Sequence, residues 1–296
     1  MFSDNPYICS FGEVLWDMLP SGKLPGGAPM NVAAHLQNLG IHTAMISRVG
    51  DDALGEEIKA FMSRNNCSTA YVQTDATHGT GVVQVTLSAT NQASYDIVYP
   101  ISWDFIAPSS ALIDLLSNSY ALIYGTLACR DVVSRTTLLD LIDCARLKVY
   151  DVNFRAPHYT RDLVELLLSK ANIVKMNDEE LDIISAWYGE IDASIEFKMR
   201  YLKTKFDITM LVVTEGADGA SLLCDTGFYK SNGYKVQVQD TVGSGDAFLA
   251  GFLKNYFDHN SPEYMLNYAC ALGALVATHK GANPPIDEAD ILKMMG

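Results

Sequence analysis

The chain alternates short runs of β-branched and aromatic residues with longer segments in which apolar residues recur at helical spacing. From residue 121 the alternation is regular. It predicts strands at 121–124, 147–152, 172–175 and 208–213, separated by helices at 132–145, 163–169, 178–186 and 193–203. Strands separated by helices need right-handed crossovers, which place them parallel in one sheet. The sequence therefore predicts an α/β fold with a mostly parallel central sheet.

The first part of the chain follows the same order. A strand at 7–12 is followed by a helix after the stretch LPGGAPMN, a second strand at 43–48 and a second helix at 53–64. The carboxylates of Glu13 and Asp17 come just after the first strand. Since α/β sheets bind ligands beyond the carboxyl ends of their strands, these side chains are candidates for a binding site.

The segment between these two regions has another pattern. Residues 82–87 and 95–99 alternate apolar and polar side chains around a polar turn at 90–92. This pattern predicts a β-hairpin inserted between helices. Such a hairpin could form a lid or a dimerisation surface, or could simply extend the central sheet, and the pattern does not distinguish these alternatives.

Composition excludes several classes of protein. The 296 residues carry a formal charge of −14 from 21 basic and 35 acidic residues, without a Lys/Arg cluster, so nucleic acid is not an expected partner. The six cysteines are scattered and form no C-x-x-C pair, which favours reduced thiols and a cytoplasmic location. No signal peptide is recognisable, and no apolar run approaches the roughly 20 residues that span a bilayer. A membrane partner is not expected.

The stretch QDTVGSGDAFLAG, residues 239–251, places glycines and small hydroxyl residues directly before an amphipathic helical pattern. Small residues at a helix start leave backbone N–H groups accessible, and the helix dipole adds positive potential, so the stretch predicts an anion-binding site. Asp246 in the first turn could be a general base for a proton released beside the anion. For this short pattern alone, a capping carboxylate that interacts with the helix dipole is the commoner role.

Several well-known catalytic patterns are absent from the sequence. It contains no P-loop, no dinucleotide fingerprint, no G-x-S-x-G elbow, no H-E-x-x-H pair and no H-R-D loop. The six histidines do not pair at metal-ligand spacing, so a zinc site is not expected. A nicotinamide-dependent oxidoreductase is disfavoured because no dinucleotide fingerprint follows the first strand.

Two motifs in order, GGAPMN at 26–31 and DTVGSGD at 240–246, resemble those of the PfkB/ribokinase-like carbohydrate kinases. The resemblance extends over essentially the whole chain through supporting matches, and GGAPMN and DVNFR (151–155) are most similar to the fructokinases. It implies a three-layer α/β/α sandwich of the ribokinase type with a small β-lid. The α/β domain would comprise residues 1–70 and 105–296, and the lid residues 71–104, with extra lid strands from 12–25.

The resemblance also implies roles for individual residues. Asp246 would be the general base, and the amides of Gly243, Ser244 and Gly245 would stabilise the transferring phosphoryl group. The sugar would be bound by Asp17, Gly26, Gly27, Asn31, Arg155 and Asp246. The nucleotide would be bound by Asn177, Thr214, Gly216, Gly219, Gly245 and Cys270. Mg²⁺ would be held through water by Asn177 and Glu180, and a monovalent cation such as K⁺, which many members bind, by Asp240, Val242, Val276, His279 and Gly281.

Several of these residues also have a purely structural interpretation. Asn177 with Glu180 fits a helix capping box, and residues 214–219 fit a hairpin turn. Asn31 could cap a helix, Gly26 and Gly27 could form an ordinary loop, and Arg155 could form a surface ion pair. The residues alone leave both interpretations open.

As a whole, the resemblance implies an ATP-dependent kinase that converts D-fructose to fructose 6-phosphate, with the β-lid as a candidate homodimer surface. A 2-keto-3-deoxygluconate or ribose-type kinase is the alternative within the class. A non-catalytic sugar-binding regulatory module is the alternative from another class. Tyr99 replaces an Arg that many fructokinases carry near the end of the lid hairpin, and Cys270 replaces an Asn near the adenine, so sugar identity and nucleotide preference stay open.

Overall fold

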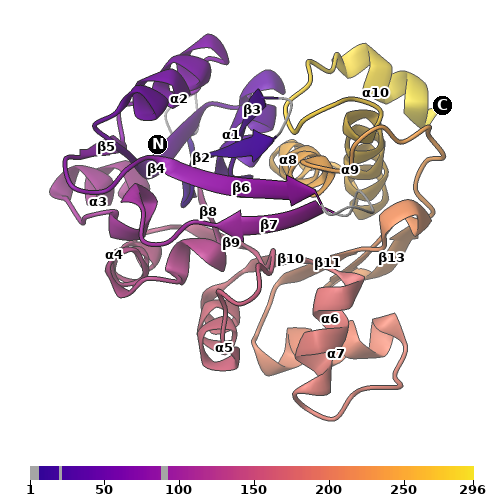
Figure 1. Ribbon diagram of the computed structural model, residues 1–296. Helices are drawn as coiled ribbons and strands as arrows, with labels where there is room; N and C mark the ends of the chain where they lie inside the picture. Colours follow the sequence, from indigo (N-terminus) through magenta and orange to yellow (C-terminus); the bar gives the residue numbers. More distant parts are fainter. Residues whose placement is uncertain (1–6, 20–21, 88–92) are drawn as a thin grey trace.

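The computed structural model describes residues 7–19, 22–87 and 93–296 (Figure 1). The turn predicted at 90–92 and the amino-terminal residues 1–6 lie outside the described residues. Within them, a nine-stranded sheet has the order β13-β12-β11-β10-β9-β8-β1-β4-β5. Its strands are β1 (Ile8–Phe11), β4 (Thr43–Gly50), β5 (Val72–Asp75), β8 (Ala121–Gly125), β9 (Leu147–Asp151), β10 (Ile173–Asn177), β11 (Met210–Thr214), β12 (Ala220–Cys224) and β13 (Gly227–Ser231).

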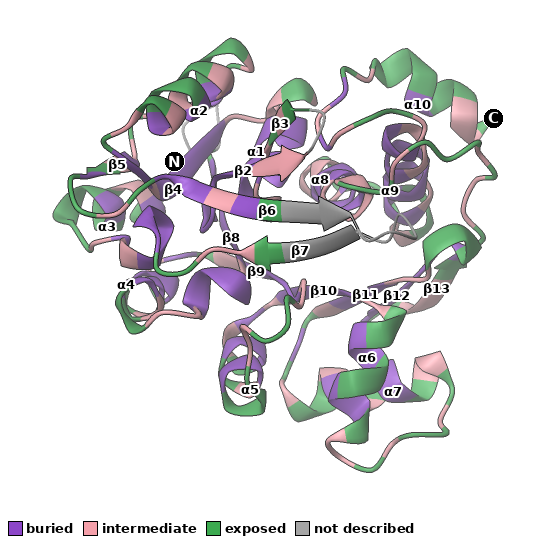
Figure 2. Cartoon of the chain, viewed as in Figure 1, coloured by how far each residue is buried: buried purple, intermediate pink, exposed green. Residues whose placement is uncertain are grey.

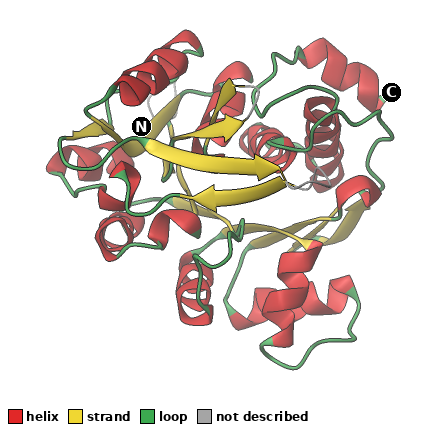
Figure 3. Cartoon of the chain, viewed as in Figure 1, coloured by secondary structure: helices red, strands yellow, loops and turns green. Residues whose placement is uncertain are grey.

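The strands from β5 to β11 in this order pair in parallel, and β12 and β13 are antiparallel additions at one edge. The crossovers are made by helices, as the alternation predicts. The helices are α1 (Ala28–Asn38), α2 (Ala53–Arg64), α3 (Ser110–Ser117), α4 (Val132–Ile142), α5 (Arg161–Lys170), α6 (Asp178–Ala186), α7 (Ile195–Lys205), α8 (Ser244–Phe257), α9 (Pro262–Ala277) and α10 (Glu288–Met295). Figure 3 shows these helices around the strands.

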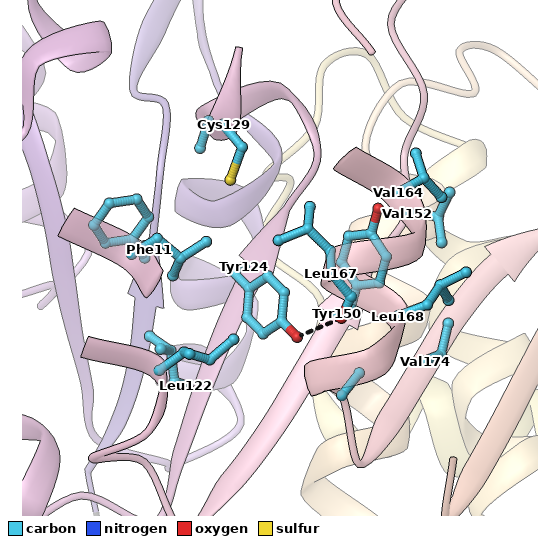
Figure 4. Close-up of a cluster of buried hydrophobic side chains, with 14 of the residues drawn as sticks. Phe11, Leu122, Tyr124, Cys129, Tyr150, Val152, Val164, Leu167, Leu168 and Val174 are labelled. Carbon is cyan, nitrogen blue, oxygen red and sulfur yellow. Dashed lines mark hydrogen bonds between the residues drawn. The ribbon is translucent and has the colours of Figure 1, made fainter. Parts of the chain in front are cut away.

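Two apolar cores lie on opposite faces of the central sheet because successive side chains of a strand point to opposite faces. In β8, Leu122 and Tyr124 join the core under α3 to α7, whereas Ile123 joins the core under α1, α8 and α9. Figure 4 shows part of the first core, in which the Tyr124 hydroxyl donates to the carbonyl of Leu167 at 3.2 Å. Figure 2 shows buried residues concentrated where helices meet the sheet. The expected three-layer fold is confirmed.

A second, four-stranded sheet, here called the small sheet, has the order β3-β2-β6-β7. It contains β2 (Leu15–Leu19), β3 (Gly22–Gly26), β6 (Gly81–Leu87) and β7 (Ala93–Ile97). The hairpin β6–β7 therefore does not extend the central sheet.

The boundary expected for the inserted segment at residue 71 is wrong. β5 lies within the range 71–104, but it pairs in parallel with β4 in the central sheet, where Val72 and Asp75 are buried. The expected end of the segment at residue 104 also falls inside a 3₁₀ helix, Ser102–Phe105. Trp103 of this helix is fully buried. Sequence alternation did not identify β5 because this strand has only four residues, VQTD, of which three are polar.

Within the described residues, no helix is both long and apolar enough to cross a membrane.

Candidate active site

The candidate site lies beyond the carboxyl ends of the central strands, where β1, β9, β10 and β11 end near one another. The strand register places Lys175 opposite Asp151, and Asn177 opposite Thr214. Glu13 follows β1, which lies two strands from β9 in the same sheet. Residues far apart in the sequence are thus brought to one edge by the parallel topology.

Asp246 lies in the first turn of α8 and is partly exposed. Its Oδ2 accepts a hydrogen bond from Asn31 Nδ2 at 2.8 Å. Burial, together with the negative charge of Asp151, raises the pKa of Asp246 to about 6, while Lys175 and Asn31 act in the opposite direction. A carboxylate with such a pKa is mostly ionised at pH 7. Because its pKa lies only slightly below that pH, it can also accept a proton from an alcohol.

The chain enters α8 through a left-handed residue, Gly243, with φ of 81°. A Cβ atom there would lie 2.5 Å from Ala282 Cα, so the glycine is required by packing as well as by conformation. The amide of Ser244 donates to the carbonyl of Thr241 at 3.2 Å. Among the residues that the structure describes, no backbone acceptor is recorded for the amides of Gly243 and Gly245. Two of the three expected donors are therefore free for an anion.

A buried cation that the sequence analysis missed lies beside these amides. Lys175 Nζ is 3.0 Å from Asp151 Oδ1, and both residues are buried. Burial lowers the pKa of Lys175, but the charges of Asp151, Glu180 and Asp246 outweigh it and hold the pKa above its ordinary value. The ammonium group therefore stays charged. A lysine inside a strand that is covered on both faces was the available signal, because a buried lysine requires a partner.

Three residues expected to bind the sugar, Asp17, Gly26 and Gly27, lie close together around the segment that follows β1. A Cβ atom on Gly26 would lie 2.7 Å from Asp17 Oδ2, and one on Gly27 would collide with the carbonyl of Glu13. Burial raises the pKa of Asp17, and the positive charge of Arg155 opposes this. The bare glycine surface and the carboxylate therefore face the same space.

Arg155 is exposed, and its guanidinium donates to the carbonyl of Phe154 at 3.0 Å. No salt bridge to Arg155 occurs among the described residues. Burial raises the pKa values of Glu13 and Asp246, and the positive charge of Arg155 opposes that rise at both groups. Among the described residues Arg155 therefore forms no surface ion pair, and its charge acts on the carboxylates of the site.

Asn177 and Glu180 form the capping box of α6. Asn177 Oδ1 accepts from the Glu180 amide at 2.7 Å, and Glu180 Oε2 accepts from the Asn177 amide at 2.8 Å. Glu180 Oε1 accepts from the Phe154 amide at 2.7 Å. Each carboxylate oxygen already has a backbone donor, so this buried anion suits contact with a hydrated cation better than direct coordination.

The remaining residues expected at the nucleotide lie at the carboxyl end of β11, in the turn that follows it, and in α9. Gly216 and Gly219 have φ of 55° and 97°, and a side chain on Gly219 would collide with the carbonyl of Ser231. Thr214 is the last residue of β11, and its side chain is partly exposed. Cys270 is buried, which raises the pKa of its thiol to about 11. The thiol is therefore neutral.

The residues expected at a monovalent cation are connected by Asp240. Its Oδ1 accepts from the Val242 amide at 3.0 Å, and its Oδ2 accepts from the Gly281 amide at 3.1 Å. Val276 and His279 are joined in the last turn of α9, where the His279 amide donates to the Val276 carbonyl at 3.0 Å. The structure thus assembles this loop, although that carbonyl is already a hydrogen-bond acceptor.

The fold and this site define a class of protein. A carboxylate with a raised pKa, accessible amides at a helix start and a buried cation are the kinds of group that phosphoryl transfer requires. Residues 9–289 match the pfkB family carbohydrate kinase, so the chain belongs to this family. The resemblance drawn from the two sequence motifs is confirmed.

Several known proteins are similar to this chain. Fructokinase-1 of Oryza sativa subsp. japonica is 29% identical over 325 residues, which cover 100% of this chain and 99% of that protein. The structure of fructokinase with bound ATP from Xylella fastidiosa has a TM-score of 0.85 at 24% identity and covers 98% of both chains. Fructokinase from Vibrio cholerae O395, in its fructose, ADP and calcium ion bound form, has a TM-score of 0.84 at 23% identity, covering 99% and 100%.

Proposed function

We propose that this chain transfers the γ-phosphoryl group of ATP to D-fructose and releases fructose 6-phosphate and ADP. The observation that carries the proposal is the position of Asp246, which lies at the start of α8 with a hydrogen bond from Asn31 and a pKa of about 6. The fructokinases that are similar over the full length of the chain support fructose as the acceptor.

In this proposal, Asp246 accepts the proton of the attacking hydroxyl. The amides of Gly243 and Gly245 hold the migrating phosphoryl group, with a weaker contribution from Ser244, whose amide also donates to Thr241. The ammonium group of Lys175 adds positive charge beside Gly245. Because the transition state spreads negative charge over the phosphoryl oxygens, these fixed donors stabilise it more than the ground state.

The sugar would lie on Gly26 and Gly27, with hydroxyl contacts to Asp17 and Asn31 and with Arg155 at the rim. Its reactive hydroxyl would face the partly exposed Asp246. The hairpin β6–β7 would cover the sugar and keep water out, which limits hydrolysis of ATP. The small sheet is also our candidate for the surface of a homodimer.

The nucleotide would extend over the ends of β10 and β11, near Asn177, Thr214, Gly216 and Gly219, toward Cys270. Mg²⁺ would be held through its waters by Asn177 and Glu180, and it would neutralise the nucleotide phosphates. Two buried carboxylates support this site. The negative charge of Asp151 acts on Glu180. The Oδ2 atom of Asp151 has no hydrogen-bond partner among the described groups. K⁺ could bind the loop that Asp240 organises. We place the enzyme in the cytoplasm because its six cysteines are all free.

A substrate panel tests the proposal. ADP release is measured with Mg-ATP and fructose, ribose, 2-keto-3-deoxygluconate, tagatose or nucleosides. We expect the highest kcat/KM with fructose. A clear preference for another sugar would move the chain to another kinase of the family, and sugar binding without ADP release would identify a non-catalytic module.

A further inference from the structure

A short segment after α9, residues 281–283, contacts the site at three points. The Gly281 amide donates to Asp240 Oδ2 at 3.1 Å. The carbonyl of Ala282 accepts from His35 Nε2 at 2.8 Å, and Asn283 Nδ2 donates to Asn31 Oδ1 at 2.7 Å. The segment therefore connects the cation loop to helix α1.

The contact with Asn31 continues to the carboxylate of Asp246. Asn31 is 4% exposed, and its two amide atoms face opposite partners, with Nδ2 donating to Asp246 at 2.8 Å and Oδ1 accepting from Asn283. An ionised carboxylate can only accept hydrogen bonds, so it requires the NH₂ group of Asn31. The Oδ1 atom must then face a donor, which Asn283 provides.

The geometry around Asn283 favours one direction of the two hydrogen bonds that lead from Asn283 through Asn31 to Asp246. His35 and Asn31 are four residues apart on α1, so they lie on the same face of the helix and hold neighbouring residues of the segment. Among the described residues, Asn283 Oδ1 has no hydrogen-bond partner. Within the part of the chain that the structure describes, the hydrogen bond to Asn31 is thus the one polar contact of the Asn283 side chain. It determines the orientation of the Asn283 amide group.

We propose that Asn283 is a positioning residue, which holds the amide of Asn31 with its NH₂ group toward Asp246 and so leaves the second carboxylate oxygen for the acceptor hydroxyl. The inference rests on the proposed function only in taking Asp246 as the base. No sequence pattern indicates this role, because an asparagine between Ala282 and two prolines is typical of a turn.

Other charges face Asp246 and must be considered in any test that varies pH. Asp151 and Lys175 approach it from β9 and β10, and Glu13 and Arg155 from the loops after β1 and β9. None of these groups is changed by substitution at Asn283. Asn283→Asp adds a carboxylate whose own charge also raises the pKa of Asp246. Asn283→Ala adds no charge, so a difference in that variant reports on the hydrogen bonds from Asn283 through Asn31 to Asp246.

The decisive substitution is Asn283→Asp, which keeps the shape of the side chain but replaces its donor with an acceptor. Asn31 is then expected to turn its NH₂ group toward the new carboxylate, which leaves Asp246 facing an oxygen atom. We expect kcat/KM for the sugar to fall about 10- to 100-fold, since a hydrogen bond to a charged group is lost. The acid limb of the pH–rate profile should move upward by about one pH unit.

Asn283→Ala removes the donor without adding an acceptor, so the loss should be smaller, about three- to tenfold. Asn260→Ala is the matched control because Asn260 Nδ2 donates to Asn255 Oδ1 at 2.8 Å in a second amide pair, at the far end of α8. It should leave the pH–rate profile unchanged. An unchanged profile in Asn283→Asp as well would overturn the proposal, even if activity fell.

A measurement without turnover separates this inference from the proposed function. The pKa of Asp246 is followed by NMR on protein labelled with ¹³C at aspartate, in the native chain and in both Asn283 variants. We expect an upward shift in both variants, whether or not fructose is the substrate, and the shift in Asn283→Ala is decisive because that variant adds no charge. A pKa of Asp246 in Asn283→Ala equal to the native value would reject the positioning role, whatever Asn283→Asp shows.

Discussion

The ammonium group of Lys175 occupies the space in which a side chain on Gly245 would lie, with a Cβ atom there only 3.1 Å from Nζ. The same ammonium is 3.0 Å from Asp151 Oδ1. A buried ion pair is thereby placed against the start of α8, beside the amides that we propose as the anion hole. The absence of a side chain at Gly245 leaves room for the lysine and, in our proposal, for the phosphoryl group.

Substitution of the two glycines of the motif should give different results. In Gly243→Ala, the left-handed φ and the contact with Ala282 Cα force the backbone to move, so we expect a loss of about 2–4 kcal/mol in the free energy of unfolding. In Gly245→Ala, only the end of a lysine side chain must shift, so stability should stay within about 1 kcal/mol. Its kcat should nevertheless fall about tenfold or more, because the cation is displaced. Urea unfolding and ADP release measure the two effects, and equal stability losses would contradict this account.

Lys175→Met should be strongly destabilising. It leaves the buried carboxylate of Asp151 unpaired, which costs about 3–5 kcal/mol. Lys198→Met is the control, because Lys198 pairs at 2.8 Å with Asp182, whose side chain is 63% exposed. That loss should be about 0–1 kcal/mol by urea unfolding. Similar values for the two variants would show that the ion pair at the site has no special role in stability.

Glu13→Gln should change how stability depends on pH. Burial raises the pKa of Glu13 from 4.5 to about 7. Between these values the folded chain keeps a proton that the unfolded chain has released, so this contribution to stability is complete below pH 4.5 and is lost as pH rises to 7. The glutamine variant should therefore be about 1–3 kcal/mol more stable than the native chain at pH 8 and equal to it near pH 4.5. Urea unfolding across this range checks the sign, and a variant that is less stable at pH 8 would refute it.

Arg155→Ala should weaken sugar binding. The exposed guanidinium makes a contact only with its neighbour Phe154 among the recorded hydrogen bonds, so little stability is at stake. We expect KM for fructose to rise about tenfold or more, with a smaller change in kcat. Arg200→Ala, which breaks an exposed pair with Glu196, is the control and should leave KM unchanged. A change in thermal stability alone would favour a structural role for Arg155.

Much of this architecture is predictable from the sequence, because alternation of strand and helix patterns determines a parallel sheet and its ligand-binding edge. The glycine motifs could be located because positive φ and close approach require that residue type. Lys175 was missed because in a strand of five residues one charged side chain resembles the polar face of an edge strand. Asn283 could not be found, since its contact with Asn31 joins residues 252 positions apart through loop geometry that no periodicity records.

The central claim is that Asp246 is the base, and Asp246→Asn tests it most directly. The amide keeps the shape of the side chain but cannot accept the proton, so kcat for fructose should fall about 10²- to 10⁴-fold. Calorimetry should at the same time show the affinities for fructose and Mg-ATP within a few-fold of the native values. A variant whose kcat stays within a few-fold of the native chain would contradict the account.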